Sequence, residues 1–251
     1  MDESQIGSYS LDALVDTYDI DNIYEQYKRL EFLEKLSRYV NLSQSKVVEF
    51  GSATGQMTKL LSTVAQAVVA VDGSGEFIAI AKKKVADAAN VTFYRSYFEE
   101  FSLAEKFDCL IMHHVLEHIE NPLLLLAKAK DLLAEDGVVA FSVPNAQALS
   151  RQLAVKMGLL SSVHELTDND KRHGHYRVYD WSLLEGQVKE SGYQIVGRHG
   201  LSFKLFADKQ NVAMLEREII GPGQIKGLWL LGDEMPEVAG AIMIVAKKTT
   251  P

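Results

Sequence analysis

The sequence predicts an α/β protein built on a doubly wound, mostly parallel sheet of seven strands. Two observations carry this prediction. Between residues 46 and 144, short and continuously apolar runs alternate with amphipathic segments long enough for helices of 10 to 16 residues. A turn rich in small residues also follows the first apolar run directly. Strands that are apolar throughout are typical of parallel sheets, since helices cover both of their faces.

The expected elements follow one another without a repeat or a low-complexity stretch. Apolar residues at helical spacing predict an amphipathic helix over residues 21–40. Further helices are expected at 57–65, 76–88, 122–137 and 181–192, and strands at 46–50, 67–72, 91–96, 107–114, 138–143, 193–200 and 241–248. Gly137 is placed as the C-terminal stop of the helix that starts at Pro122.

The chain is expected to divide into an N-terminal lid or helix, residues 1–40, and one domain over residues 41–251. Two irregular stretches, 145–180 and 202–238, interrupt the second half of that domain. Helical character at 211–220 and turn signals at 221–223 lie within the second stretch. Long insertions are usually functional, and ligands of open α/β sheets bind outside the carboxyl ends of the strands. We therefore expect both insertions to form a substrate cap.

Composition limits the partners and the compartment. The formal net charge of −8 argues against broad binding to nucleic acid or to an anionic membrane, because both require a basic face. Cys109 is the single cysteine, so the sequence supports neither a disulfide framework nor a multi-cysteine metal site. The first residues lack the pattern of a secretory signal, and no apolar run approaches membrane-spanning length. The sequence thus predicts a cytoplasmic protein.

The turn from Glu49 to Gly55 is the first candidate for ligand binding. Small residues at 51, 53 and 55 let the backbone bend sharply and approach a ligand, and the helix that follows offers unpaired N–H groups. Asp72 ends the next apolar run, where a carboxylate can accept hydrogen bonds from both hydroxyls of a ribose. A dinucleotide or another adenosine-bearing cofactor fits this pattern. Gln56 stands where the dinucleotide motif has its third glycine, which disfavours the dinucleotide.

Three segments together, EFGSATGQ, VDGS and FDCLIMHHVLEHIENP, resemble the class I S-adenosylmethionine-dependent methyltransferases, in particular the branch of ubiquinone-biosynthesis-type O-methyltransferases. The resemblance is carried by residues 40–145, and it implies a Rossmann-like fold with S-adenosyl-L-methionine as cofactor and S-adenosyl-L-homocysteine as product. The implied cofactor-binding residues are Glu49, Gly51, Ala53 and Gly55 around the methionine part, Asp72 with Gly73 at the ribose, Tyr97 and Phe98 at the adenine, and His113.

The sequence departs from the family pattern at two places. Ala53 replaces the central glycine of the turn, which is a mild change. Tyr97 and Phe98 stand where many relatives carry an acidic residue close to the adenine. Adenine contact is therefore expected through stacking and the backbone of residues 97–98 rather than through a carboxylate.

The predicted reaction is methyl transfer to a small-molecule acceptor at a hydroxyl oxygen. Holding the acceptor in line with the methyl group is mainly a matter of orientation, but a hydroxyl also requires a base. His114 and His175 are the candidate bases, because the end of the fourth strand and the first insertion should flank the methyl group. Three alternatives stay open: N-methylation of a small amine or amino sugar, an NAD-dependent oxidoreductase, and a non-catalytic S-adenosylmethionine-binding protein.

Two further patterns have a less specific meaning. His114 to His118 matches the zinc pattern H-x-x-E-H, but only a short helical turn fits before Pro122 and no third ligand is apparent, so no metal is predicted. Aromatic residues could line an apolar substrate pocket or belong to the core; these are Tyr18, Tyr24, Tyr27, Phe203, Phe206 and Trp229. The apolar segment 227–232 would suit a pocket wall or a homodimer contact.

Overall fold

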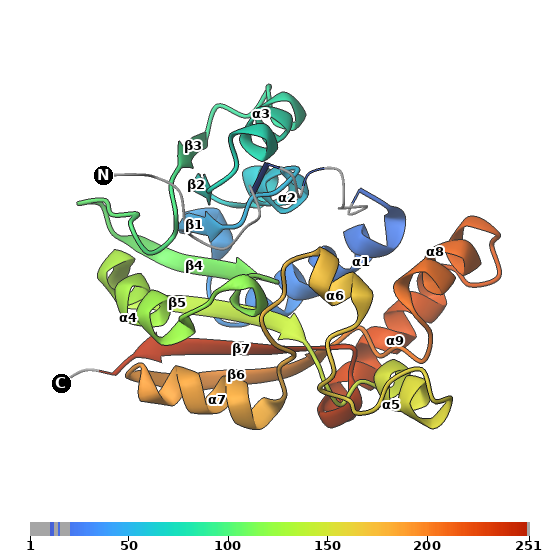
Figure 1. Ribbon diagram of the computed structural model, residues 1–251. Helices are drawn as coiled ribbons and strands as arrows, with labels where there is room; N and C mark the ends of the chain where they lie inside the picture. The colour runs from blue at the N-terminus through green and yellow to red at the C-terminus, as the bar shows by residue number, and fades with distance from the viewer. Residues whose placement is uncertain (1–10, 13–14, 16–20, 250–251) are drawn as a thin grey trace.

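The computed structural model describes residues 11, 12, 15 and 21–249. Within these residues lies a seven-stranded sheet with the order β3-β2-β1-β4-β5-β7-β6 (Figure 1). The strands are β1 (Lys46–Phe50), β2 (Ala67–Asp72), β3 (Val91–Arg95), β4 (Phe107–His113), β5 (Leu133–Pro144), β6 (Tyr193–Leu201) and β7 (Ala241–Lys248). The pairs from β3 to β5 are parallel, and β7 runs antiparallel to both β5 and β6. The predicted doubly wound, mostly parallel sheet is confirmed.

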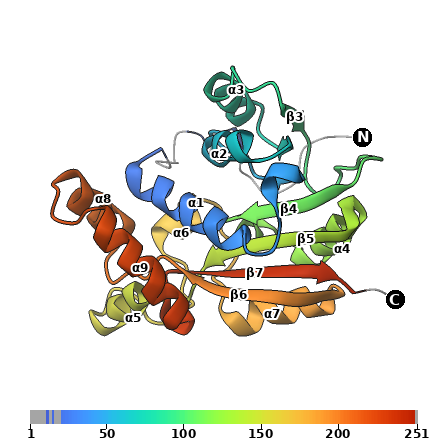
Figure 2. The ribbon, with the colours of Figure 1, turned by 180° about the vertical axis from the view of Figure 1, so that it is seen from behind.

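Helices cover both faces of the sheet. They are α1 (Ile23–Leu36), α2 (Gln56–Val64), α3 (Gly75–Lys84), α4 (Pro122–Leu132), α5 (Leu149–Lys156), α6 (Asp168–Arg172), α7 (Trp181–Glu190), α8 (Asp208–Glu216) and α9 (Pro222–Glu234), with short 3₁₀ turns η2 (Leu42–Gln44), η3 (Leu116–His118) and η4 (Pro236–Val238). Helices α4 and α7 pack on one face, and α1 and α2 pack on the other (Figures 1 and 2). Helices α5, α6, α8 and α9 gather toward the carboxyl ends of β4 and β5 (Figure 1).

The alternation of side chains along β4 shows why its sequence is apolar throughout. Leu110 and Met112 point into the core beneath α4 and α7, whereas Cys109 and Ile111 point into the core beneath α1 and α2. All four side chains are fully buried, because successive residues of a strand face opposite sides of a sheet.

Helix α1 packs directly on one face of the sheet. Its Phe32 and Leu36 are fully buried in the same cluster as Val47 of β1 and Ile111 of β4. Asn22 caps the helix by accepting a hydrogen bond from the backbone N–H of Glu25. This packing ties residues 23–36 to the sheet. The expected division at residue 40 stays a prediction.

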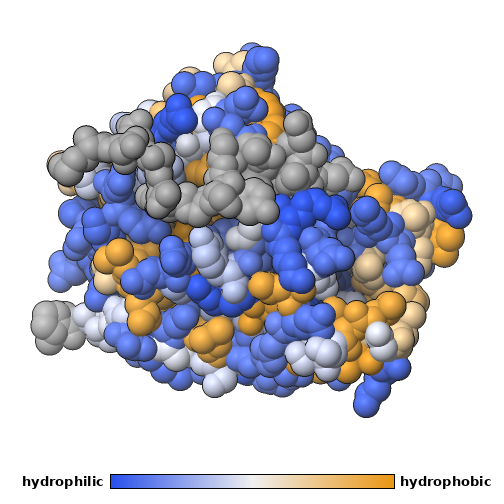
Figure 3. All heavy atoms as spheres, viewed as in Figure 1, coloured by the Kyte–Doolittle hydropathy of each residue, from blue (hydrophilic) through white to orange (hydrophobic). Residues whose placement is uncertain are grey.

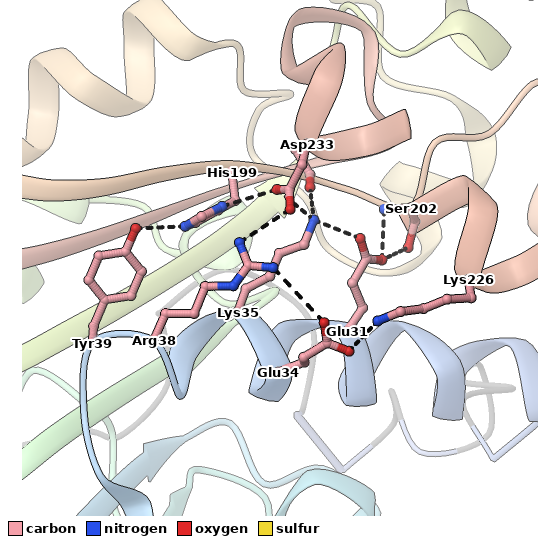
Figure 4. Close-up of polar contacts among 10 residues, drawn as sticks. Glu31, Glu34, Lys35, Arg38, Tyr39, His199, Ser202, Lys226 and Asp233 are labelled. Atoms are coloured by element: carbon pink, nitrogen blue, oxygen red, sulfur yellow. Dashed lines mark hydrogen bonds and ion pairs between the residues drawn. The ribbon is translucent and has the colours of Figure 1, made fainter. Parts of the chain in front are cut away.

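A buried polar network also fastens α1 to β6 and α9 (Figure 4). The ammonium group of Lys35 donates to Gly200 O at 2.6 Å and pairs with Glu31 Oε1 at 2.9 Å and Asp233 Oδ1 at 3.0 Å. The other oxygen of Glu31 accepts from the backbone N–H of Ser202 at 2.8 Å and from its hydroxyl at 3.1 Å. The buried ammonium group of Lys35 thus has one hydrogen bond and two ion pairs that offset the cost of its burial.

Two expectations about element boundaries were wrong. Helix α4 ends at Leu132 instead of Gly137, and Gly137 lies inside β5, because Leu133 already pairs with Phe107 in the parallel ladder. The turn expected at residues 221–223 is the start of a helix, with Pro222 in the first turn of α9, where a missing N–H has no cost. Segment 227–232 therefore lies within α9. Among the described helices, none combines the length and apolarity needed to cross a membrane.

Candidate active site

The turn between β1 and α2 adopts the left-handed backbone that its small residues favour. Gly51 and Gly55 have φ values of 82°, and Ala53 has a φ of 42°. A Cβ on Gly51 would come within 2.9 Å of Val115 Cγ2, so glycine here leaves space between the turn and the loop after β4. Gly55 instead faces α3, where a Cβ would come within 2.8 Å of Ala81. Gly55 therefore allows the turn to bend and lets it pack closely against α3.

Glu49 is buried at the end of β1, beside this turn. Thr58 Oγ1 donates to its Oε2 at 2.6 Å, and its Oε1 has no hydrogen-bond partner. Burial raises the pKa of Glu49 to about 8, although the hydrogen bond from Thr58 and the charge of Arg29 act in the opposite direction. At neutral pH the carboxyl is therefore largely protonated, and a nearby cation would favour its ionised form.

Asp72 is also buried, and it holds the turn in place. Its Oδ2 accepts from the backbone N–H of Ala53 and its Oδ1 from that of Ser74, both at 2.9 Å. Burial raises its pKa, and these two N–H groups partly offset that effect. A carboxylate has about four lone-pair sites, so each oxygen keeps one for a further donor.

The residues predicted to meet the adenine lie beside β2. A Cβ on Gly73 would come within 2.5 Å of Leu11 and 3.7 Å of Tyr97, so Leu11 lies over this loop. Half of the Tyr97 side chain is exposed. Phe98 stacks on Phe50 with ring centroids 4.9 Å apart and an interplanar angle of 11°. One face of Phe98 thus packs against Phe50 in the core, whereas the Tyr97 ring is exposed.

His113 and His114 mark the carboxyl end of β4. Ser142 Oγ lies 2.7 Å from His113 Nδ1, while His113 Nε2 is buried without a partner. Burial, with His114 and Arg29 nearby, lowers the pKa of His113 well below its usual value. His114 has a φ of 56°, a strained conformation for a residue other than glycine, and its Nδ1 lies 3.1 Å from Glu117 Oε1.

The second predicted catalytic histidine, His175, lies near the carboxylate of Glu117. His175 comes from the segment after α6, and its ring lies 4.6 Å from that of His118. Ligand atoms of Glu117, His118 and His175 all lie within 4.8 Å of one another. This group does not include His114, so it differs from the H-x-x-E-H pattern of the sequence. His114 and His175 approach Glu117 from two different segments, and their catalytic role stays a prediction.

Sequence reasoning missed Arg29 and Glu117 as site residues. Arg29 of α1 is buried, and its positive charge lowers the pKa of Glu49. Burial lowers its pKa, whereas Glu25, Asp21 and Glu49 raise it. Arg29 shares a helical stripe with Phe32, Leu33 and Leu36, and a charged residue on an apolar stripe is a signal that could have revealed it.

A small, partly open pocket lies between α1 and α9. Its lining residues are Tyr24, Tyr27, Lys28, Ser202, Phe203, Ile225, Leu228 and Trp229. Tyr27 and Trp229 meet edge to face, with ring centroids 6.4 Å apart. Four of the predicted pocket aromatics are thus brought together. Phe206 is outside this lining, and Tyr18 falls outside the described residues.

Buried polar atoms without partners collect where these elements meet. Within the described chain they include Glu49 Oε1 and Ser52 Oγ at the glycine turn and His113 Nε2 and Glu117 Oε2 at the end of β4. Leaving a buried polar group unpaired costs about 1–3 kcal/mol. A polar ligand at the carboxyl ends of β1 and β4 would give these atoms partners.

The fold is that of S-adenosylmethionine-dependent methyltransferases. The N-methyltransferase NodS of Bradyrhizobium japonicum, solved with S-adenosyl-L-homocysteine, superimposes with a TM-score of 0.59 at 14% identity, over 92% of this chain and 90% of NodS. A methyltransferase of this type from Aquifex aeolicus gives a TM-score of 0.61 at 14% identity, over 95% of this chain and 98% of that protein.

The family follows from the sequence comparison. Residues 22–197 match the family model described as a methyltransferase domain, and the chain belongs to this family. A ubiquinone biosynthesis O-methyltransferase from Actinobacillus pleuropneumoniae is 27% identical over 47% of this chain and 52% of the relative. An uncharacterised methyltransferase from Bacillus cytotoxicus is 29% identical over 54% and 62%. These matches thus cover between about half and two thirds of the length of the curated relatives.

Proposed function

We propose that this protein transfers a methyl group from S-adenosyl-L-methionine to a hydroxyl oxygen of a small molecule. The observation that carries the proposal is the group of unpartnered buried atoms at Glu49, Ser52 and His113, beside a glycine turn in a methyltransferase fold. Polar groups of this kind require a polar ligand. The amino acid part of the cofactor, with its ammonium and carboxylate groups, supplies donors and acceptors for them.

The residues around the turn fit the two ends of this cofactor. Glu49 Oε1 would accept from the ammonium group, and the Arg29 guanidinium would face the carboxylate. Asp72 keeps a lone pair on each oxygen for the two ribose hydroxyls. When bound, the cofactor supplies a sulfonium methyl group as the electrophile. The protein has to bind the cofactor and the acceptor, orient them and exclude water. It also has to remove the acceptor proton.

His114 is the proposed general base. With Nδ1 donating to Glu117 Oε1 across 3.1 Å, the other nitrogen of the neutral ring is left as a proton acceptor. Glu117 fixes this tautomer and stabilises the imidazolium that forms when the acceptor proton arrives.

Calorimetric titration with S-adenosyl-L-homocysteine tests the cofactor assignment. Wild-type protein should bind, and Asp72→Asn should bind about 2 kcal/mol more weakly, or roughly 30-fold, through loss of charge-assisted hydrogen bonds. The amide keeps the shape of the carboxyl group and one of the two oxygens that accept from the turn, whereas alanine would remove both. Asp87→Asn, a change on the surface after α3, is the matched control and should bind like wild type. Absence of binding by the wild type would overturn the proposal, and NAD would then be titrated.

Cofactor binding should also release a proton near pH 7. Glu49, with a pKa of about 8, is mostly protonated in the free protein, and an ammonium group beside Oε1 would favour the ionised form. The binding enthalpy measured in phosphate and in Tris should therefore differ by the ionisation enthalpy of the buffer. Glu49→Gln should remove this difference. A wild-type enthalpy that is independent of the buffer would contradict the placement of the ammonium group at Glu49.

A panel of acceptors separates oxygen from nitrogen methylation. Catechol, a sugar alcohol, a small aliphatic amine and an amino sugar are incubated with S-adenosyl-L-methionine, and S-adenosyl-L-homocysteine is measured. Product with the hydroxyl compounds alone supports the proposal, and product with the amines alone replaces it with N-methylation. Cofactor binding without turnover of any acceptor would support a non-catalytic protein. A cytoplasmic location and a homodimer contact through α9 stay predictions.

A further inference from the structure

Arg177 joins the first insertion to the loop that follows β4. Its Nη1 donates to Ile119 O at 2.6 Å, and its Nη2 donates to Glu120 O at 2.9 Å. We propose that Arg177 is a positioning residue, which fixes this loop so that Glu117 holds the base His114 in place. This role rests on the proposed function, in which His114 removes the acceptor proton.

The carbonyl groups at the end of η3 require donors from other segments. η3 is a single 3₁₀ turn, and the last carbonyl groups of such a turn lie outside its own hydrogen bonds. The backbone N–H of Tyr176 donates to Glu117 O at 2.8 Å, and the two bonds of Arg177 follow at residues 119 and 120. Three of the four carbonyl groups over residues 117–120 thus accept from two adjacent residues of the insertion.

Arg177 is itself held by a buried residue. Its guanidinium group hydrogen-bonds to the hydroxyl of Tyr179, whose side chain is fully buried. That hydroxyl donates in turn to Gln187 Oε1 of α7 at 2.9 Å. The backbone N–H of Ala146, after β5, donates to Tyr179 O at 2.6 Å. The guanidinium group therefore links a support within the core to the loop after β4.

Hydrogen bonds carry this attachment, because the helix that precedes Arg177 offers little apolar contact. No side chain of α6 is buried. The surface over α6 is hydrophilic on the face that Figure 3 shows (Figures 1 and 3). Arginine suits such a place, since its planar fork of donors can meet two carbonyl groups at once. We therefore expect the loss of Arg177 to loosen the loop after β4.

His114 is the part of the loop that needs such support. Its φ of 56° is strained for a residue other than glycine, and such strain persists only where neighbouring contacts fix the backbone. Its backbone N–H donates to Ser142 O at 2.9 Å, which fixes one end of the loop to β5. Glu117 Oε1, at 3.1 Å from Nδ1, orients the ring. Arg177 fixes the other end of the loop, so it acts on the base through Glu117 and needs no contact with the acceptor.

The kinetics of three variants test this role. Arg177→Met keeps the apolar stem but has no donor, so kcat for a hydroxyl acceptor should fall by about 10–100-fold, as expected when a catalytic group is misplaced. Its affinity for S-adenosyl-L-homocysteine should stay close to that of wild type. Arg177→Lys should recover part of the rate, because an ammonium group can still donate to one carbonyl group. Arg172→Met, at an exposed arginine of the same insertion, is the matched control and should react like wild type.

A double-mutant cycle separates positioning from a general structural role. In the His114→Asn background, the change Arg177→Met should lower kcat little further, because the side chain that Arg177 positions is already absent. Losses that multiply in the double variant would show that Arg177 acts independently of His114, and they would overturn the inference. A wild-type kcat in Arg177→Met would overturn it as well.

The ring nitrogens of His114 give a readout that does not depend on turnover. Nitrogen-15 NMR spectra of the histidine rings show which nitrogen carries the proton, and His114→Asn identifies the His114 signals. Wild type should carry the proton on Nδ1, as its contact with Glu117 requires, and Arg177→Met should show a mixture of both tautomers. Unchanged His114 signals in Arg177→Met would contradict the inference. If no acceptor is methylated, the proposed function fails, while these signals still decide whether Arg177 holds His114.

Discussion

Replacement of His114 with asparagine should lower kcat for a hydroxyl acceptor by about 10²–10⁴-fold, the usual contribution of a general base. Asparagine is chosen because it tolerates the left-handed backbone at this position, where φ is 56°. The variant should therefore fold like wild type while lacking a group that accepts the proton. The rate is measured as S-adenosyl-L-homocysteine formation with catechol, or with the first hydroxyl compound of the panel that turns over.

The affinity for S-adenosyl-L-homocysteine provides the control for this variant. It should change little, because His114 acts on the acceptor and the proposed cofactor contacts lie at Glu49 and Asp72. His164→Asn should retain the wild-type rate, since that side chain is exposed and contacts Asp180 alone among the described ion pairs. A His114→Asn protein that keeps full kcat toward hydroxyl acceptors would remove His114 from the role of base.

Replacement of Lys35 with alanine should destabilise the protein by about 3–5 kcal/mol, the usual cost of removing one partner from a buried ion pair. The change leaves Glu31, whose side chain is 0% exposed, without its cation. It also leaves Gly200 O and Asp233 without a donor from α1. Urea denaturation at pH 7, followed by circular dichroism, measures the loss of unfolding free energy.

Two further variants separate the buried charge from a general loss of contacts. Glu31→Gln combined with Lys35→Met removes both charges, and it should recover much of the stability lost in Lys35→Ala. Arg38→Ala breaks an ion pair with Asp233 at 3.3 Å, but the arginine side chain is 45% exposed, so its effect should stay below about 1 kcal/mol. A Lys35→Ala protein as stable as wild type would show that the network adds nothing to the attachment of α1.

The parts of the fold that were predictable are those with a local signal. The apolar runs of β1, β2 and β4 and the helical spacing of α1 are visible in a single stretch of sequence. The glycine turn and Asp72 follow their strands directly, so their place at the carboxyl edge of the sheet is fixed by the strand that precedes them. The end of α4 lacked such a signal, because Leu133 starts β5 through pairing with Phe107, a residue distant in sequence.

Which distant segments come into contact could not be predicted in the same way. His118 and His175 are separated by 57 positions, yet their rings lie 4.6 Å apart, and nothing in either segment indicates the other. The charge of Arg29 acts on Glu49 because α1 packs on the same core as β1, whereas the pattern of α1 alone indicates only that Arg29 shares its buried stripe. Lys35 finds its acceptors on β6 and α9 for the same reason.

The sequence by itself determined the layered α/β architecture, the family and the turn that would hold the cofactor, because periodicity, glycine and a strand-end carboxylate act over a few neighbouring residues. The tertiary structure decided which groups share a site. Burial leaves Glu49 Oε1 and Glu117 Oε2 without partners, and only the packing of distant elements around them determines what ligand each can accept. Hydrogen bonds and charges act over a few ångströms in space, and the number of residues between two groups does not indicate how far apart they lie in the fold.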